Sequence, residues 1–314
     1  MFCCNFVVMR GNCKIYCAPM QGITDHVWRS AHASVFGGVD HYCAPFMRVE
    51  HGEIRRRDLR DILPENNSVP VIPQLLACKA DDARRLAMTI KEMGYSLIDI
   101  NLGCPHPPVA LRHKGSGMLK YPDEVKAMFI ALAGIEGVSY SVKMRLGWDD
   151  ELQWKQILDL LPIINPQHVT IHPRTGKQQY GGELKSEQFE QLLDICPYPI
   201  IYNGEIKTKD DIDNICDRYD KVAGIMIGRG LVSHPHMLEE TVSTKAIKQF
   251  HDNLVAEYST LDGGEHVALN KLRAMWQYFL PEADRRALKA IKKSKTLNDY
   301  NEAAAAAIDS IQTD

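Results

Sequence analysis

Long apolar runs are missing from this sequence, and so is a large excess of charge of either sign. No stretch reaches the ~18 consecutive apolar residues of a membrane-spanning helix, and residues 1–9 lack the basic start and the cleavage site of a secretory signal. Against 37 Lys and Arg stand 40 Asp and Glu, so net charge does not indicate nucleic-acid binding. We therefore expect a cytoplasmic protein outside the membrane, in which any RNA contact comes from local basic patches.

The cysteine spacing of a zinc site is also missing. The nine cysteines are odd in number and scattered, without two Cys-x-x-Cys pairs or a Cys/His quartet of suitable spacing. A chain of 314 residues can bury a core without disulfides. We predict mostly reduced thiols and no metal, and we expect a monomer.

Eight short apolar runs, bounded by turn residues, alternate with helical patterns. This alternation is typical of βα units around a parallel sheet. Eight such units fit an α/β protein with a (β/α)8 TIM barrel, which needs ~250 residues, better than an open Rossmann-like sheet. The expected strands are Lys14–Ala18, Asp40–Ala44, Val71–Leu75, Leu97–Asn101, Tyr140–Met144, His168–His172, Pro199–Tyr202 and Gly224–Ile227.

Helical patterns fill the gaps between these runs and continue alone after Pro235. We predict a leader over residues 1–11, a catalytic barrel over 12–240 and an all-helical C-terminal domain over 241–314. The expected helices are Asp25–Val35, Asp81–Met93, Asp123–Leu132, Leu152–Leu161, Ser186–Asp194, Asp210–Cys216, Thr244–Tyr258, Val267–Phe279, Glu282–Lys293 and Asp299–Ile311.

Polar residues leave nearly every predicted strand. Catalytic groups of TIM barrels lie at the C-terminal strand ends. We therefore expect these residues to converge at that end of the barrel, which we call the mouth. They are Pro19, Met20 and Gln21 after the first strand, Gln74 in the third, Asn101 and Cys104 at the fourth, Lys143 and Arg145 at the fifth, His172 and Arg174 at the sixth, Asn203, Gly204 and Glu205 at the seventh, and Gly228 and Arg229 at the eighth.

Glycines after the last two strands indicate a phosphate site, because barrels often bind phosphate there with backbone N–H groups. Either glycine pair alone could simply form a turn, but their joint position favours phosphate, and Arg229 adds charge. Lys143, if partly desolvated at the mouth, needs an anionic partner such as a reduced flavin. The alternative is that Lys143 is only a surface lysine at a frayed strand end.

Cys104 stands between Gly103 and Pro105 just past a strand, which displays it on a loop. It could act as a nucleophilic thiolate or as a neutral proton donor, since an unperturbed pKa of ~8.5 keeps a thiol mostly protonated at neutral pH. A nucleophile needs an adjacent base. His106 is two residues away on a proline-rich loop, which is a poor position for that base, so we favour the acid role.

Seven segments together resemble, in order, the tRNA-dihydrouridine synthases. The resemblance covers the first 235 residues or so, and the chain departs from the family at Ser116, in the proline-rich stretch Pro105–Pro108 and in the leader before Lys14. The C-terminal helices look most like the bacterial subtype that modifies uridine 16. The segments are Ala18–Asp25, Asn101–Pro105, Lys114–Gly117, Val142–Trp148, Ile171–Thr175, Asn203–Ile206 and Ile227–Gly230.

The resemblance implies reduction of specific uridines in tRNA to 5,6-dihydrouridine. Hydride would pass from FMN to C6 of uracil and a proton from Cys104 to C5, with NADPH reducing the flavin. Asn101 and Arg174 would grip the uracil, which must be extruded from its stack. FMN would be held by Pro19, Met20, Gln21, Gln74, Lys143, His172, Asn203, Gly204, Glu205, Gly228 and Arg229.

Two basic clusters could bind the tRNA. Six positive charges fall within residues 285–295, at Arg285, Arg286, Lys289, Lys292, Lys293 and Lys295, and Arg55, Arg56, Arg57 and Arg60 form a second cluster. Such a run is ordinarily a solvated helix face, but beside a barrel that reduces a base in RNA we favour phosphate contacts. Two alternatives stay open: an FMN oxidoreductase of a free pyrimidine or other small molecule, and a non-catalytic RNA-binding module on a flavin barrel.

Overall fold

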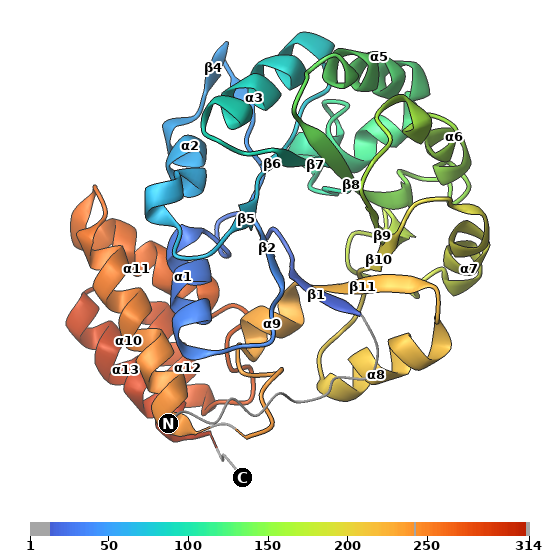
Figure 1. The fold of residues 1–314 in the computed structure, drawn as a ribbon. Coiled ribbons are helices and arrows are strands. Elements are labelled where there is room, and N and C mark those ends of the chain that lie inside the picture. The colour runs from blue at the N-terminus through green and yellow to red at the C-terminus, as the bar shows by residue number, and fades with distance from the viewer. Residues whose placement is uncertain (1–12, 242, 312–314) are drawn as a thin grey trace, which may run out of the picture.

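The computed structural model describes residues 13–241 and 243–311, so the predicted leader over residues 1–11 lies outside the described residues. One sheet with nine strands curls around a central axis (Figure 1) in the order β5-β2-β1-β11-β10-β9-β8-β7-β6, and each neighbouring pair is parallel. The strands are β1 (Lys14–Cys17), β2 (His41–Cys43), β5 (Val71–Ile72), β6 (Gln74–Leu75), β7 (Leu97–Leu102), β8 (Ser139–Gly147), β9 (Val169–Thr175), β10 (Ile200–Tyr202) and β11 (Val222–Ile227).

Pro73 divides the predicted third strand into β5 and β6. β5 pairs with β2, whereas β6 pairs with β7. Proline has no N–H for the ladder, yet its carbonyl oxygen still accepts from the Asp99 N–H at 2.8 Å. The two short strands are continuous along the chain and close the barrel. The predicted (β/α)8 barrel is therefore confirmed, with every expected strand found near its predicted position.

Helices pack around the outside of the sheet (Figure 1), and their ends depend on local chemistry. Asp25 caps α1 by accepting from the Trp28 N–H, and Thr208 with Asp211 forms a capping box on α8. The expected helix over Leu152–Leu161 is shorter, because Pro162 has no N–H for the Leu158 carbonyl. The outer helices are α1 (His26–Val35), α3 (Ala80–Glu92), α5 (Pro122–Ala133), α6 (Trp154–Leu158), α7 (Ser186–Ile195) and α8 (Lys209–Arg218), with a 3-10 turn at Leu161–Ile163.

The barrel interior changes from apolar to polar along its axis. A small apolar cluster, separate from the main core between strands and helices, fills the interior with Tyr16, Ala18, Cys43, Ile72, Ile201 and Met226. Beyond this cluster, toward the C-terminal strand ends, alternate residues of β7, β8 and β9 are polar. Because side chains alternate across a strand, Asp99 and Asn101 point to the same face. The fold thus gathers the polar strand residues at one end.

Several short elements were not predicted. Between residues 44 and 71 lie a hairpin of β3 (Val49–Glu50) and β4 (Glu53–Ile54), helix α2 (Arg56–Ile62) and a 3-10 turn at Pro64–Asn66. Two more short helices, α4 (Pro107–Ala110) and α9 (Arg229–Ser233), follow β7 and β11, and a 3-10 segment spans Gly115–Lys120. Elements of two to seven residues carry too little periodicity to be recognised by pattern.

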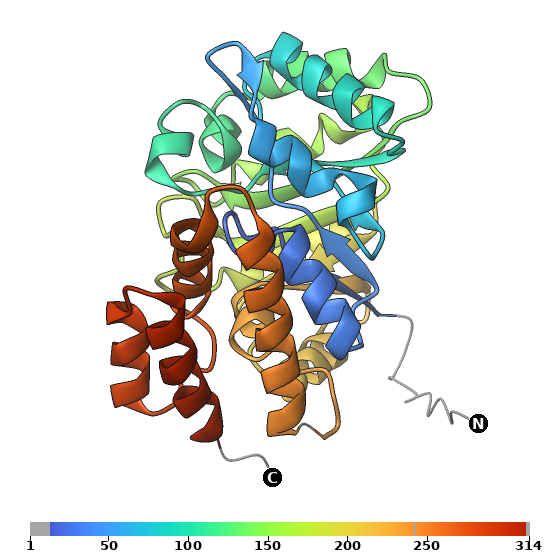
Figure 2. The ribbon, with the colours of Figure 1, turned by 90° about the vertical axis from the view of Figure 1, so that its left-hand side faces the viewer.

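The last four helices pack beside the barrel, and α10 lies along α1 (Figure 2). They are α10 (Thr244–Thr260), α11 (Gly264–Met275), α12 (Arg285–Lys293) and α13 (Leu297–Asp309). The four predicted C-terminal helices are therefore present, while their separation as a domain from residue 241 stays a prediction. Within the described residues, none of the helices combines the length and the apolar character needed to cross a membrane.

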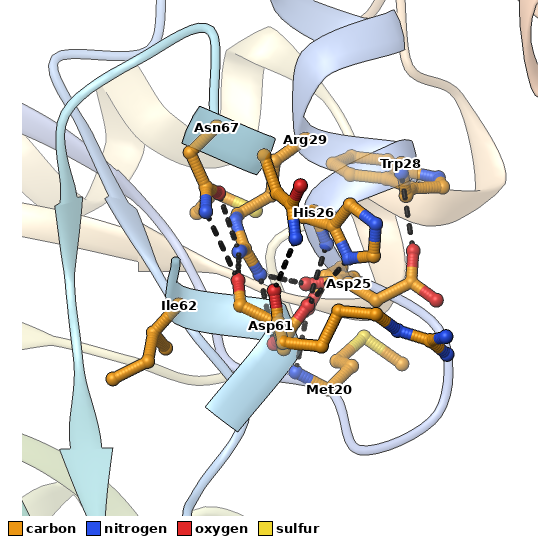
Figure 3. A network of polar contacts seen from close by, with 12 residues as sticks. Met20, Asp25, His26, Trp28, Arg29, Asp61, Ile62 and Asn67 are labelled. Carbon is orange, nitrogen blue, oxygen red and sulfur yellow. Dashed lines mark hydrogen bonds and ion pairs between the residues drawn. The ribbon is translucent and has the colours of Figure 1, made fainter. Parts of the chain in front are cut away.

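A fully buried arginine joins α1 to α2 (Figure 3). The Arg29 guanidinium donates to the carbonyl oxygens of Thr24 and Asp61, and to Asn67 Oδ1, each at 2.7 Å. It also forms an ion pair with Asp61 Oδ2 at 3.3 Å. Burial alone would raise the pKa of Asp61, but Arg29 and hydrogen bonds from His26 outweigh burial, and that pKa lies below its usual value.

Replacing Arg29 with methionine should therefore lower the free energy of unfolding by about 3–5 kcal/mol, because it leaves a buried carboxylate without its partner. Urea denaturation measures this change. The matched control is Arg218→Met, which removes a surface ion pair with Glu190 of 2.8 Å and should cost at most about 1 kcal/mol. Equal losses in the two variants would contradict the structural role of Arg29.

Candidate active site

The polar residues predicted to meet at the mouth do come together from several strands. Asn101 on β7 lies opposite Lys143 on β8 in the sheet register. Lys143 Nζ donates to Asn203 Oδ1 at 2.6 Å, which connects β8 to the segment after β10. Asn203 Nδ2 in turn donates to the Met226 carbonyl oxygen of β11 at 2.7 Å. Four strands are thus linked at their C-terminal ends.

A chain of hydrogen bonds runs through this end of the barrel to Cys104. Ser141 Oγ and Gln74 Nε2 donate to the two carboxylate oxygens of Asp99, at 2.7 and 2.6 Å. Asn101 Nδ2 donates to Gln74 Oε1 at 2.6 Å, and Asn101 Oδ1 accepts from the Cys104 N–H at 2.9 Å. Gln74 is fully buried. Its carboxamide is therefore held by protein groups at both ends.

The Cys104 loop is held tightly on its other side. The Ser116 hydroxyl and the Ser116 N–H both donate to the Cys104 carbonyl oxygen, at 2.9 and 3.0 Å. Gly115 has a φ of 58° and lies so near that a Cβ there would be 2.7 Å from the same oxygen, so glycine is needed at this position. Ser116, a departure from the family it resembles, fixes the loop. Pro107 and Pro108 stand at the first helical positions of α4, which suits proline.

Burial keeps the Cys104 thiol protonated. Its side chain packs with Phe46, Leu76 and Val109. Burial raises the pKa of Cys104 above its usual value, although the His106 backbone N–H, Arg145, Lys143 and Arg48 act in the opposite direction. In the described residues no side-chain base is hydrogen-bonded to the sulfur. This environment suits a proton donor better than a thiolate nucleophile.

The last two strands carry an ion-pair cluster. Glu205 Oε1 accepts from Arg174 Nη1 at 2.8 Å and from Arg229 Nη2 at 2.7 Å, and Lys207 lies 3.8 Å from the other carboxylate oxygen. Arg174 also donates to the Gly182 carbonyl oxygen at 2.9 Å. Three cations therefore surround one carboxylate, and the cluster carries net positive charge.

The pKa values of His172 and Lys143 at the mouth are lowered partly by the neighbouring positive charges. Burial lowers the pKa of His172 well below its usual value, and Arg145, Lys143, Arg174 and Arg229 lower it further. Burial lowers the pKa of Lys143 to about 8, with Arg145 adding to the effect. His172 is thus a neutral imidazole at neutral pH, while Lys143 keeps most of its charge.

Two important residues were missing from the predicted set. Arg145 was seen as a strand-end residue but given no role. It is buried, and it donates to the carbonyl oxygens of Gly103 at 3.1 Å and Thr175 at 2.8 Å. Asp99 was missed although a simple signal existed, because its place two residues before Asn101 puts both side chains on one strand face.

The loop after β1 reaches the same end. Thr24 Oγ1 donates to the Ala18 carbonyl oxygen and accepts from the Met20 N–H at 2.8 Å. Gly228 lies against this loop, because a Cβ there would be 3.5 Å from Met20 Sδ. Pro19 and Met20 are partly buried and Gln21 is exposed. This arrangement brings the first and eighth strand ends together.

The C-terminal helices anchor this loop through Asp25. One Asp25 carboxylate oxygen accepts from the Tyr258 hydroxyl of α10 at 2.8 Å, and the other is 2.6 Å from Lys271 Nζ of α11. Asp25 also caps α1. The helical bundle is therefore bonded directly to the segment that carries Met20.

The basic residues of α12 lie apart from the strand ends, on a helix packed against α13. In the described residues none of these five cations belongs to an ion pair, and all are exposed. By contrast, Arg55, Arg57 and Arg60 of the second cluster pair with acidic groups. The α12 set consists of Arg285, Arg286, Lys289, Lys292 and Lys293.

The cysteines of the described residues are all free thiols, at positions 13, 17, 43, 78, 104, 196 and 216. Over the same residues, no three His, Cys, Asp or Glu side chains gather in a group that could hold a metal ion.

Similarity to known proteins extends over most of the chain. The family model for Dihydrouridine synthase (Dus) matches residues 16–308. The tRNA-dihydrouridine(16) synthase of Haemophilus ducreyi is 29% identical over 311 residues, which cover 92% of each chain. The tRNA-dihydrouridine synthase B of Pasteurella multocida is 29% identical over 269 residues, or 85% of this chain and 78% of the relative. An old yellow enzyme homologue from Zymomonas mobilis shares only the fold, with a TM-score of 0.50 and 9% identity over 76% of this chain and 92% of that chain.

Proposed function

The chain belongs to the dihydrouridine synthase family, and from this premise we propose that it reduces specific uridines of tRNA to 5,6-dihydrouridine with bound FMN. The observation that carries the proposal is the position of the Cys104 thiol, whose pKa burial raises, on a fixed loop beside Lys143 and Arg145. Saturating the C5–C6 bond of uracil requires a proton at C5 and stabilisation of negative charge on the C4 carbonyl. A half-buried thiol and nearby cations supply those two functions.

The mouth fits FMN in charge and in architecture. The cations that lower the pKa of His172 outnumber Glu205, so the site favours a phosphate dianion. Arg229 begins the short helix α9 directly after the eighth barrel strand, and barrels often place phosphate at the N-terminus of such an extra helix. We propose that the phosphate lies among Gly204, Gly228 and Arg229.

The other proposed FMN contacts are Pro19, Met20, Gln21, Gln74, Lys143, His172, Asn203 and Glu205. Lys143, with its ammonium fixed by Asn203 at 2.6 Å, supplies positive charge for the electron-rich ring. When bound and reduced, FMN supplies the hydride for C6 of uracil. We propose NADPH as the reductant.

On the protein side, Cys104 donates its proton to C5 of the uracil. Asn101 and Arg174 are the proposed uracil contacts. Asn101 Nδ2 has two N–H bonds and gives one to Gln74, which leaves the other for a carbonyl oxygen. Arg174 also donates hydrogen bonds to Glu205 and to the Gly182 carbonyl oxygen. Its contact with the uracil therefore depends on the order of the loop that carries Gly182.

We propose uridine 16 as the modified position. The support is the Haemophilus ducreyi relative, whose similarity covers 92% of both chains. The exposed cations of α12, which form no ion pair within the described part of the chain, support a tRNA substrate over a free pyrimidine, since a small substrate needs no such surface. Because tRNA is the proposed substrate, we propose the cytoplasm as the location of the protein.

Replacing Lys143 with alanine should weaken FMN binding, because it removes a cation from the mouth. In the parent protein the FMN dissociation constant should rise as pH increases through about 8, where Lys143 loses its proton, and this rise should be absent in Lys143→Ala. Fluorescence titration of the apoprotein with FMN measures both effects. Lys185→Ala, which removes a partly exposed lysine paired with Glu151, is the control. A protein that binds no FMN would refute the cofactor assignment.

The activity itself is tested by incubating the purified protein with FMN, NADPH and tRNA that lacks dihydrouridine. Accumulation of dihydrouridine in the tRNA is the expected result. NADPH oxidation that depends on free uracil or uridine and not on tRNA would support the small-molecule alternative instead.

A further inference from the structure

We propose that Asp99 is a positioning residue that sets the orientation of Gln74 and Asn101 and thereby holds the Cys104 loop. Its consequence for catalysis rests on the proposed function, whereas its consequence for the loop does not. Asp99 is 2% exposed inside the barrel and makes no contact with the Cys104 loop itself among the hydrogen bonds of the described residues.

The direction of the hydrogen bonds shows why an acceptor oxygen is needed at position 99. Asn101 Oδ1 accepts from the N–H groups of Gly103 at 3.1 Å and Cys104 at 2.9 Å, so the Asn101 nitrogen must face Gln74. Gln74 must then offer its oxygen to Asn101, which turns its nitrogen toward Asp99. Both Asp99 oxygens accept hydrogen bonds, one of them from Gln74, and an acceptor at this place permits only this one order of the two carboxamides.

Groups from two further elements surround Asp99 and keep it in place. Ser141 of β8 donates to its second oxygen at 2.7 Å. Burial raises the pKa of Asp99, and the hydrogen bonds from Gln74 and Ser141 and the charge of Lys143 on β8 oppose this rise. Cys43 of β2 also lies near, as a neutral thiol, because burial raises its pKa well above the usual value. Both Asp99 oxygens already accept hydrogen bonds from protein groups. We therefore assign Asp99 no direct contact with a ligand at the mouth.

The result for the site is a fixed pattern of donors. The oxygen of Asn101 already accepts two N–H groups, whereas one N–H on each carboxamide nitrogen is left over. The two carboxamides therefore offer donors, which suit ligands that present carbonyl oxygens. A reversed Gln74 would instead face Asn101 with nitrogen against nitrogen and release the Cys104 loop.

The test measures alkylation of Cys104 by iodoacetamide in the protein without FMN or tRNA, followed by mass spectrometry of the Cys104 peptide. Asp99→Leu removes the acceptor of the Gln74 hydrogen bond. Gln74→Leu removes the residue that connects Asp99 to Asn101. Each should raise the alkylation rate about fivefold, because the loop loses hydrogen bonds worth about 1 kcal/mol each. The double variant should match the single ones, since the carboxylate acts through Gln74.

Two further variants separate positioning from general loosening of the barrel. Asp99→Asn should restore near-normal alkylation, because its oxygen can still accept from Gln74 while its nitrogen donates to Ser141. Thr170→Val, the control, removes a buried hydroxyl of β9, two strands away from Asp99, that has no hydrogen-bond partner among the described residues, and should change nothing. If Asp99→Leu does not fold, an unchanged rate in Gln74→Leu overturns the proposal.

Additive effects of Asp99→Leu and Gln74→Leu would also contradict it, because they would mean that the two residues act independently. In tRNA reduction, Asp99→Leu should lower kcat and leave KM for tRNA unchanged. A parent protein that does not reduce tRNA would refute the proposed function alone, since the alkylation result stands without tRNA.

Discussion

Replacing Cys104 with alanine is expected to lower the rate of dihydrouridine formation in tRNA by about 10²–10⁴-fold, the usual contribution of a positioned general acid. The thiol is raised in pKa by burial against Phe46, Leu76 and Val109, so it carries the proton at neutral pH. FMN binding and reduction of the flavin by NADPH should persist, because the loop is held through backbone groups of Cys104 that alanine retains. Single-turnover reduction of tRNA measures the loss.

Cys196→Ala is the matched control, because Cys196 is also a half-buried free thiol but follows α7, away from the strand ends that form the mouth. It should turn over normally. Normal turnover in Cys104→Ala would show that the thiol is not the proton donor. A loss of flavin reduction in the same variant would instead place Cys104 in the cofactor site.

Neutralising the five cations of α12 together should produce the second large effect, on tRNA binding. They are exposed and form no ion pair with any residue that the structure describes, so each is available to a phosphate. If all five contact phosphates, the slope of log affinity against log salt should fall by ~0.7–0.9 per contact. Affinity should drop most at low salt, while reduction of bound flavin by NADPH should not change. Filter binding over a salt series measures the slope.

The control replaces Lys91 on α3 and Lys126 on α5, exposed lysines on the far side of the barrel from α12 (Figure 1). This variant should keep the parental slope. An unchanged slope in the α12 variant would mean that α12 is only a solvated face and that tRNA binds elsewhere. Arg56 of the second cluster would then be the next residue to replace, because Arg55, Arg57 and Arg60 are already in ion pairs.

The barrel could be predicted from the sequence because each of its strands is an apolar run between turn residues. The boundary errors have local causes: Pro73 interrupts one strand and Pro162 shortens one helix. The hairpin over residues 49–54 and helix α2 could not be predicted, because they depend on contacts with distant segments. Arg29 of α1, for example, holds the end of α2 through Asp61.

The candidate site was predictable as a set of residues but not as a set of interactions. Reading the strand ends collected Gln74, Asn101 and Lys143 correctly at one place. It could not show that Gln74 is held by Asp99 and Asn101, or that Arg174 shares Glu205 with Arg229. These partners are 24 to 31 residues apart in the chain, so only the closed barrel brings them together.

The most direct test of the account is to map dihydrouridine in tRNA from cells that lack this protein. We expect dihydrouridine to disappear at position 16, to return when the parent protein is supplied, and not to return with Cys104→Ala. Unchanged dihydrouridine at every position of every tRNA would contradict the proposed function.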